Sequence, residues 1–175
     1  MNGIIDVKID TDNGNISPDL VVGDIVISKA ATGRDTHTYR AVVNKVTSDT
    51  ITLVATTQID CDKAKLWARV GNVNDTDRQA YIVMDSEGSD APKIAMYDNV
   101  NDVDKIGSVD TLKLILGNLD NISVPEFVSM NGYGLYAENV YLKGQMILGD
   151  NSSISFNSVT DGVSNVTTIT KNTVT

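Results

Sequence analysis

Apolar and polar residues alternate with a period of two through much of this chain, and short polar clusters interrupt the pattern. Residues 5–9 read Ile-Asp-Val-Lys-Ile, which is typical of a strand with one buried face. Comparable segments rich in Val, Ile and Thr recur along the chain. The pattern predicts strands within residues 5–9, 22–27, 38–46, 51–55, 65–70, 79–84, 92–97 and 112–116.

Asp, Asn, Gly, Ser and Thr fill the intervals between these strands. Residues 10–15, 31–35, 47–50 and 85–90 have turn composition, and the acidic stretch 98–109 is predicted to be a loop. Short antiparallel strands joined by tight turns predict an all-β fold. We expect a small antiparallel barrel or sandwich as the N-terminal region, followed by an extended β segment.

Two predicted strands end at the same residue pair, Gly71-Asn72 and Gly117-Asn118. Both residue types tolerate a positive φ, so we expect the pair to mark places where the chain reverses. Trp67 lies opposite Ala68 and Val70 in the alternation of its strand. We therefore expect that both faces of this strand are covered, or that Trp67 contacts a neighbouring element.

The composition changes after Gly149 to Ser, Thr and Asn with a thin series of apolar residues. The spacing of that series fits neither a regular strand nor a heptad. It is compatible with a frayed tail or with a strip that pairs with identical strips of other copies. We divide the chain into an N-terminal strand and turn (1–19), a compact β region (20–130) and an extended, Gly-hinged oligomerising segment (131–175).

Tyrosine and leucine concentrate at the beginning of this last segment, in residues 131–148. Tyrosine is favoured at interfaces because its ring buries a large area while its hydroxyl stays satisfied. The cluster could equally close the end of the preceding core. The residues predicted to form an oligomer interface are Tyr133, Leu135, Tyr136, Val140, Leu142, Ile147, Ile154, Phe156, Val163, Val166 and Ile169.

The 175-residue chain has a formal net charge of -9 and a pI of about 4.4. Such a surface repels nucleic acid and anionic membranes, so neither is an expected partner. No apolar run approaches the roughly 20 residues needed to cross a bilayer, so no membrane insertion is expected. The N-terminus has no signal-peptide pattern, and the single cysteine suits synthesis in a reducing cytoplasm.

Residues that could carry chemistry are few. Counted from Asp10, Gly14 falls at position 5 of a calcium loop and Val21 at position 12, so the EF-hand register fails. His37 and Cys61 are each the only residue of their type, too few for a zinc site. The carboxylates of residues 85–90 lie on a predicted hairpin tip, which would not hold a glycosidase pair at its working separation. We expect no enzyme activity, no cofactor and no metal.

Several short segments, in the same order along the chain, resemble segments of the minor structural and tail-tip proteins of phages and prophages of gut bacteria. They are Val22-Gly-Asp-Ile-Val26, the pair of segments 39–46 and 49–53, the word at 70–79 with Gly-Asn and Asp-Arg-Gln, Leu116-Gly-Asn118, and the segment 132–144. The match covers residues 20–148, and the last word is the most specific. The chain departs from the family at residues 61–67, where a Pro and a second Gly-Asp are missing.

The resemblance implies a virion component of the tail tip, baseplate or fibre, made in the bacterial cytoplasm and commonly trimeric. It implies other tail proteins as partners and is compatible with attachment to a host surface glycan or protein. A homotrimer also agrees with an apolar strip too thin to stabilise a monomer. A carbohydrate-binding adhesin module of the tail is the alternative, and a hydrolase or lyase acting on the envelope is a third hypothesis, motivated only by scattered carboxylates.

Overall fold

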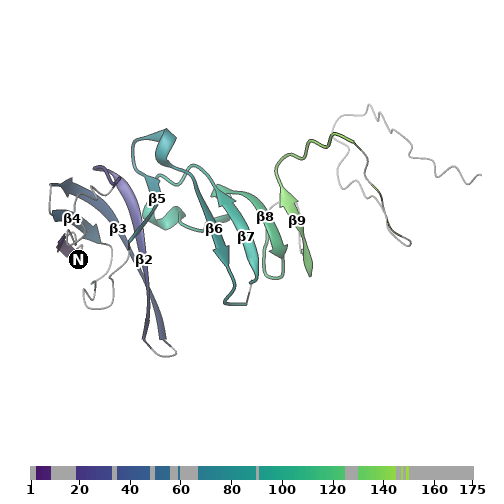
Figure 1. Ribbon diagram of the computed structural model, residues 1–175, viewed down its shortest axis with the longest axis horizontal. Coiled ribbons are helices and arrows are strands. Elements are labelled where there is room, and N and C mark those ends of the chain that lie inside the picture. The colour runs from purple at the N-terminus through teal and green to yellow at the C-terminus, as the bar shows by residue number, and fades with distance from the viewer. Residues whose placement is uncertain are drawn as a thin grey trace, which may run out of the picture. The chain divides into compact units, whose positions relative to one another are not determined.

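The computed structural model describes residues 3–8, 19–32, 35–47, 50–55, 59, 67–89, 91–124, 130–144, 147 and 149. The chain divides into two compact units, Met1–Asn139 and Val140–Thr175. All long elements of the described residues are strands, joined by three short 3₁₀ turns, which confirms the all-β prediction (Figure 1). Within the described residues no helix is long and apolar enough to span a membrane.

The first unit begins with a five-stranded antiparallel sheet, sheet A, in the order β1-β4-β3-β2-β5. Its strands are β1 (Gly3–Lys8), β2 (Asp24–Thr32), β3 (Asp35–Val46), β4 (Thr50–Ala55) and β5 (Ala68–Asn72). Strands β1 and β5 are the two edges, and no pairing between described residues joins them. The barrel alternative was therefore wrong for this part of the chain, since sheet A is open.

The strict alternation of β4 explains the core of sheet A. Ile51, Leu53 and Ala55 are buried on one face, and the residues between them are half-buried. Other buried members of this cluster are Val26, Tyr39, Ala41, Val43 and Ile59. Trp67 is half-buried and packs against the cluster, so it contacts a neighbouring element as expected.

A second antiparallel sheet, sheet B, follows in the order β6-β7-β8-β9. Its strands are β6 (Tyr81–Asp85), β7 (Lys93–Tyr97), β8 (Leu112–Asn118) and β9 (Tyr133–Ala137). Each strand pairs with the one before it in the sequence, so the sheet is a simple meander. Strand β9 belongs to the segment predicted to be extended, and here it is the edge strand of sheet B.

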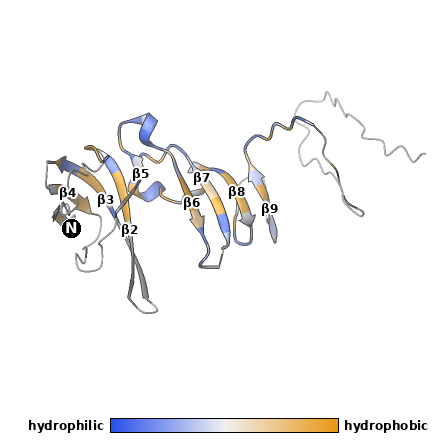
Figure 2. Cartoon of the chain, viewed as in Figure 1, coloured by the Kyte–Doolittle hydropathy of each residue, from blue (hydrophilic) through white to orange (hydrophobic). Residues whose placement is uncertain are grey.

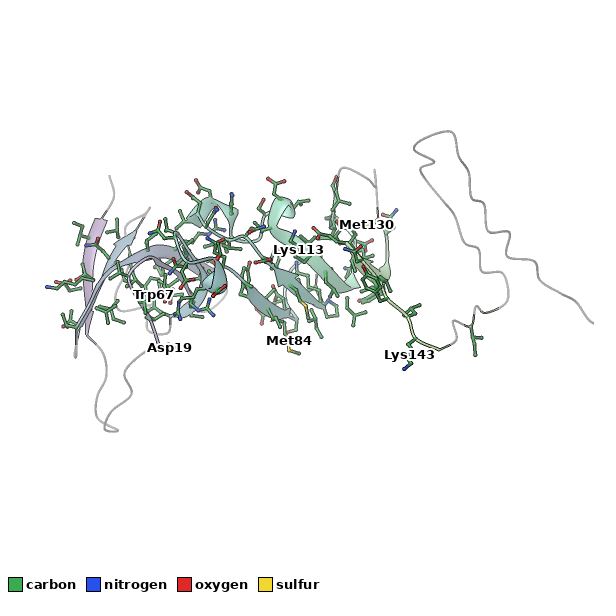
Figure 3. The ribbon with its side chains drawn as sticks, turned by 90° about the horizontal axis from the view of Figure 1, so that it is seen from above. Asp19, Trp67, Met84, Lys113, Met130 and Lys143 are labelled. Atoms are coloured by element: carbon green, nitrogen blue, oxygen red, sulfur yellow. The ribbon has the colours of Figure 1, made fainter. Side chains whose placement is uncertain are left out.

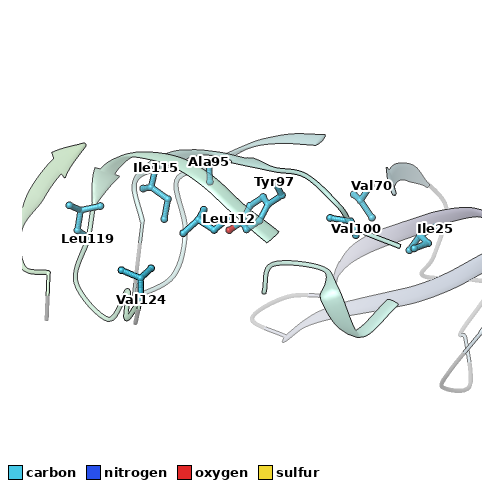
Figure 4. Packing of buried hydrophobic residues seen from close by; sticks show 9 residues of the cluster. All are labelled: Ile25, Val70, Ala95, Tyr97, Val100, Leu112, Ile115, Leu119 and Val124. Atoms are coloured by element: carbon cyan, nitrogen blue, oxygen red, sulfur yellow. The ribbon is translucent and has the colours of Figure 1, made fainter. Parts of the chain in front are cut away.

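One face of sheet B packs on a second core, shown in Figure 4. Ala95, Tyr97 and Ile115 come from this face, and Val100, Leu112, Leu119 and Val124 complete the cluster. Ile25 and Val70 of sheet A belong to the same cluster, so the two sheets share buried contacts. The Tyr81 ring stacks on Tyr97 with centroids 4.9 Å apart.

The acidic segment between β7 and β8 contains two short 3₁₀ turns, η2 (Val103–Lys105) and η3 (Val109–Thr111). The Asp102 carboxylate accepts a hydrogen bond from the Asp104 backbone N–H, and the Ser108 hydroxyl does the same for Asp110. A third turn, η1 (Thr76–Arg78), is capped by Asp75 in the same way. These acidic residues are therefore turn-forming and capping residues.

The two Gly-Asn pairs share a close approach between backbone segments, whereas the expected shared feature was a positive φ. A Cβ on Gly71 would lie 2.2 Å from the Val100 carbonyl oxygen, and one on Gly117 would lie 2.4 Å from that of Pro92. Only Gly117 has a positive φ, +141°. Both asparagines then accept backbone N–H hydrogen bonds two residues ahead. The prediction from φ held at Gly117 and was wrong at Gly71, where close backbone approach excludes a side chain.

Candidate functional site

The outer face of sheet B, opposite its core, carries two rows of apolar side chains that cross all four strands. Because β6, β7, β8 and β9 pair in register, alternate residues line up in two rows across the sheet. The first row is Ile82, Met96, Leu114 and Ala137, and the second is Met84, Ile94, Leu116 and Leu135. Tyr133 follows on the same side of β9, by alternation with Leu135. We call these residues the outer face.

The described residues leave this face open to solvent. Met84 is 78% exposed, Ile82 64% and Leu116 53%, and none of the face residues is buried. Figure 3 shows the Met84 side chain projecting outward from the sheet. Figure 2 shows hydrophobic colour running along β6, β7 and β8. An antiparallel sheet with one solvated face normally carries polar residues there, so these strands have the composition of a sheet covered on both sides.

An open hollow of about 420 Å³ lies at one end of the outer face. Its walls come from Met84, Ile94 and Leu116 of the face, together with Asp85, Ser86, Pro92 and Lys93. Asp85 and Lys93 are opposite each other in the ladder, so the charged rim of the hollow combines both signs. The hollow is shallow and mostly apolar, which suits an inserted side chain better than a polar small molecule.

The residues predicted to form an oligomer interface fall into three groups. Tyr133 and Leu135 lie on the outer face and are exposed, whereas Tyr136 is half-buried and packs against the core of sheet B. Val140, Leu142 and Ile147 are exposed in the second unit. The remaining ones, Ile154, Phe156, Val163, Val166 and Ile169, lie outside the described residues.

Most of the outer face was not predicted from the sequence. Ile82, Met84, Met96 and Leu116 were assigned to strands but to no surface. A signal was present, because residues 81–84 and 94–97 are continuously apolar rather than alternating. Such runs are typical of strands covered on both faces.

A cluster of polar side chains joins β2 and β5 of sheet A to the turn η1, which precedes sheet B. The Asp24 carboxylate is fully buried and accepts hydrogen bonds from Arg78 Nε at 2.9 Å, Arg78 Nη2 at 2.7 Å and Asn72 Nδ2 at 2.9 Å. Asn72 Oδ1 accepts the backbone N–H groups of Asn74 and Asp75, and Gln79 Nε2 donates to the Asn72 carbonyl. We call Asp24, Asn72, Arg78 and Gln79 the junction network.

The electrostatics of this network are those of a satisfied buried ion pair. Burial opposes the charged carboxylate, but the hydrogen bonds from Arg78 and Asn72 outweigh it and hold the pKa of Asp24 below its usual value. The same pairing raises the pKa of Arg78. Every group is paired, so the network is suited to fixing the backbone and has no free base or nucleophile.

The other candidate chemical groups do not form a site. Among the described residues, no cluster of His, Cys, Asp and Glu could hold a metal ion. The Asp85 carboxylate accepts the Glu87 backbone N–H at 3.1 Å, which is a hairpin-turn role. Asp90 and Cys61 lie outside the described residues, and so does the side chain of His37.

No protein-family model, curated protein or solved structure matches this chain.

Proposed function

We propose that this protein is a structural component of a phage or prophage tail, in the tip, baseplate or fibre. In this proposal the chain assembles as a homotrimer beside other tail proteins, and its extended segment from residue 131 contributes to the intertwined trimer. Contact with a host surface is compatible with that position. The protein acts by holding shape and joining subunits, without catalysis.

The observation that carries the proposal is the junction network. The sequence words that resemble the tail family, Val22-Gly-Asp and Gly-Asn with Arg-Gln, lie about fifty positions apart along the chain. Their polar residues Asp24, Asn72 and Arg78 meet in one hydrogen-bonded unit. Gly23 also lies against Asn72, because a Cβ there would be 3.1 Å from Asn72 Oδ1. The residues of these two segments therefore form one structural unit, and the tail assignment itself is proposed from the resemblance of the sequence segments.

The outer face of sheet B supports the assembly part of the proposal. Large uncharged apolar surfaces on a folded unit usually mark contacts with other proteins. The carbohydrate-binding alternative requires an open aromatic platform, for which the exposed rings among the described residues are those of Tyr133 and Tyr141. The single Trp67 instead packs against the core of sheet A.

Immunogold electron microscopy tests the proposal directly. Antibodies raised against residues 1–139 would be applied to particles made by the phage or prophage whose genome encodes the chain. We expect gold at one end of the tail, and none on particles from a strain in which the gene is deleted. Infectious particles that lack the protein altogether, by labelling and by mass spectrometry, would contradict the proposal.

A further inference from the structure

We infer that the outer face of sheet B is the surface through which copies of this chain associate. The inference deepens the assembly part of the proposed function, since it names the interface. It also relocates that interface. The sequence placed the contacts in residues 133–169, whereas the outer face lies on β6, β7 and β8 and includes only Tyr133, Leu135 and Ala137 of β9.

The size of the face fits an interface between proteins. Taking roughly 200 Å² for the full surface of a large residue, the exposed fractions of its larger members amount to about 700 Å². The largest apolar patch on a typical monomer is about 300–600 Å². A stable interface of standard size takes about 800 Å² from each partner, so the face nearly supplies one side of such a contact.

The charge distribution favours another copy of the chain as the occupant. Each copy carries a formal net charge of -9, so most of its surface would repel a second copy. The outer face differs from that surface, because none of its positions carries a charge. At its rim Asp85 stands opposite Lys93, which offsets the charge there. Copies that meet through this face keep their carboxylates apart.

The shape and chemistry of the face also suit self-association. Sheets pack face to face about 10 Å apart by interdigitating their side-chain rows. Rows of Ile, Leu and Met from three copies can also meet around a threefold axis, as a homotrimer requires, because the same patch is presented by every copy. Met84 and Met96 have flexible side chains that adapt to fill gaps, and the hollow beside Met84 can receive a side chain from a partner.

The test is the mass of the full chain by size exclusion with light scattering, for wild type and two variants. Met84→Glu places a carboxylate on the outer face, on its edge strand β6 beside the hollow. Ile4→Glu is the matched control, because Ile4 is a 71% exposed strand residue on β1 of sheet A. We expect wild type and Ile4→Glu to have three times the monomer mass of 18.8 kDa, as the homotrimer requires. Met84→Glu should raise the dissociation constant at least about a hundredfold, because like charges then meet in the interface.

A second measurement keeps the result independent of folding. Methionine oxidation by dilute peroxide, read by mass spectrometry, should be slow at Met84 in concentrated wild type and fast after dilution to the monomer. Protection that does not change with concentration would show that another part of the same chain covers the face, and would overturn the inference. Near-ultraviolet circular dichroism should show that Met84→Glu retains packed aromatic residues.

The outcomes separate this inference from the proposed function. A wild-type monomer at all concentrations, or an equally stable oligomer of Met84→Glu, would overturn the inference. Neither result would change the expected position of the gold label on the tail. Conversely, loss of the label with intact self-association would contradict the tail assignment and leave the interface standing.

Discussion

Asp24 and Arg78 form a two-pronged ion pair across 54 positions of sequence, with Nε–Oδ1 at 2.9 Å and Nη2–Oδ2 at 2.7 Å. Asp24 lies at the start of β2, and Arg78 ends the short turn η1 that follows β5. The pair therefore links the start of β2 in sheet A to the turn that precedes sheet B. A guanidinium fork on a buried carboxylate fixes orientation as well as distance.

Replacing Asp24 by Asn should destabilise the protein by about 3 kcal/mol at neutral pH, because the amide cannot accept hydrogen bonds on both sides and Arg78 loses its partner. Urea unfolding followed by the fluorescence of the single Trp67 measures this change. Asp104→Asn, at an exposed position, is the control and should change the free energy of unfolding by less than about 0.5 kcal/mol. Equal effects of the two substitutions would argue against the junction network as a stabilising unit.

The contribution of Asp24 should disappear in acid. Its folded pKa lies below the usual value of 3.8, so its stabilisation is complete above the unfolded pKa. It is lost as the pH falls through the lower, folded pKa. The difference in unfolding free energy between wild type and Asp24→Asn should therefore be constant down to about pH 4 and shrink below it. A difference that persists unchanged at pH 2 would contradict this assignment.

Tyr81 should make the fold sensitive to alkali. Burial, and then the neighbouring Tyr97, raise the pKa of Tyr81 to about 12 from 10.0, although its hydroxyl accepts a hydrogen bond from the Gly107 backbone N–H. Because the folded pKa is raised, stability is complete below the unfolded pKa of 10 and is lost as the pH rises toward 12. Urea titrations between pH 9 and 12 should show this slope in wild type and in Tyr133→Phe, whose tyrosine is exposed, and a smaller slope in Tyr81→Phe.

Gly71→Ala tests the reason for the first Gly-Asn pair. The added Cβ would lie 2.2 Å from the Val100 carbonyl oxygen, so backbone must move and we expect a loss of about 3 kcal/mol. Gly107→Ala is the comparison, since Gly107 has φ +73° and nothing within 4 Å of the added Cβ. It should cost only about 1 kcal/mol of backbone strain. If Gly107→Ala is the more harmful change, φ rather than close approach governs these turns.

The ion pair between Lys113 and Glu138, at 2.6 Å, should contribute little despite its short distance. Both side chains are substantially exposed, so solvent screens the charges and the ordering of two long side chains offsets the gain. We expect Glu138→Gln to lower the free energy of unfolding by less than about 1 kcal/mol in the same urea assay. The Glu138 backbone N–H still donates to the Lys113 carbonyl, so the junction of β8 with the chain after β9 is retained.

The hairpins were predictable because they depend on neighbours in sequence. The turn predicted at residues 47–50 joins β3 to β4, and the Thr47 backbone N–H donates to the Thr50 carbonyl at 2.8 Å. The acidic turn between β6 and β7 was found in the same way. Turn composition and the period of two report local backbone preference, which each short segment carries by itself.

The pairing of distant segments was not predictable in the same way. β1 pairs with β4 and β2 with β5, although each pair is separated by other strands. The alternation of a strand tells which of its faces is apolar but not which strand lies beside it. The open form of sheet A follows from those pairings, and for that reason the sequence left barrel and sandwich as alternatives.

By itself the sequence determined an acidic, strand-rich chain with connections between β3 and β4 and between β6 and β7, since charge, period and turn chemistry are local properties. Only the tertiary structure decided that Asp24 meets Arg78, that Tyr136 packs inward while Tyr133 and Leu135 face outward, and that the apolar runs of sheet B leave one face uncovered. An apolar side chain is buried only if another element packs on its face of the sheet. The alternation of a strand shows which residues share a face, but it does not show whether another element covers that face.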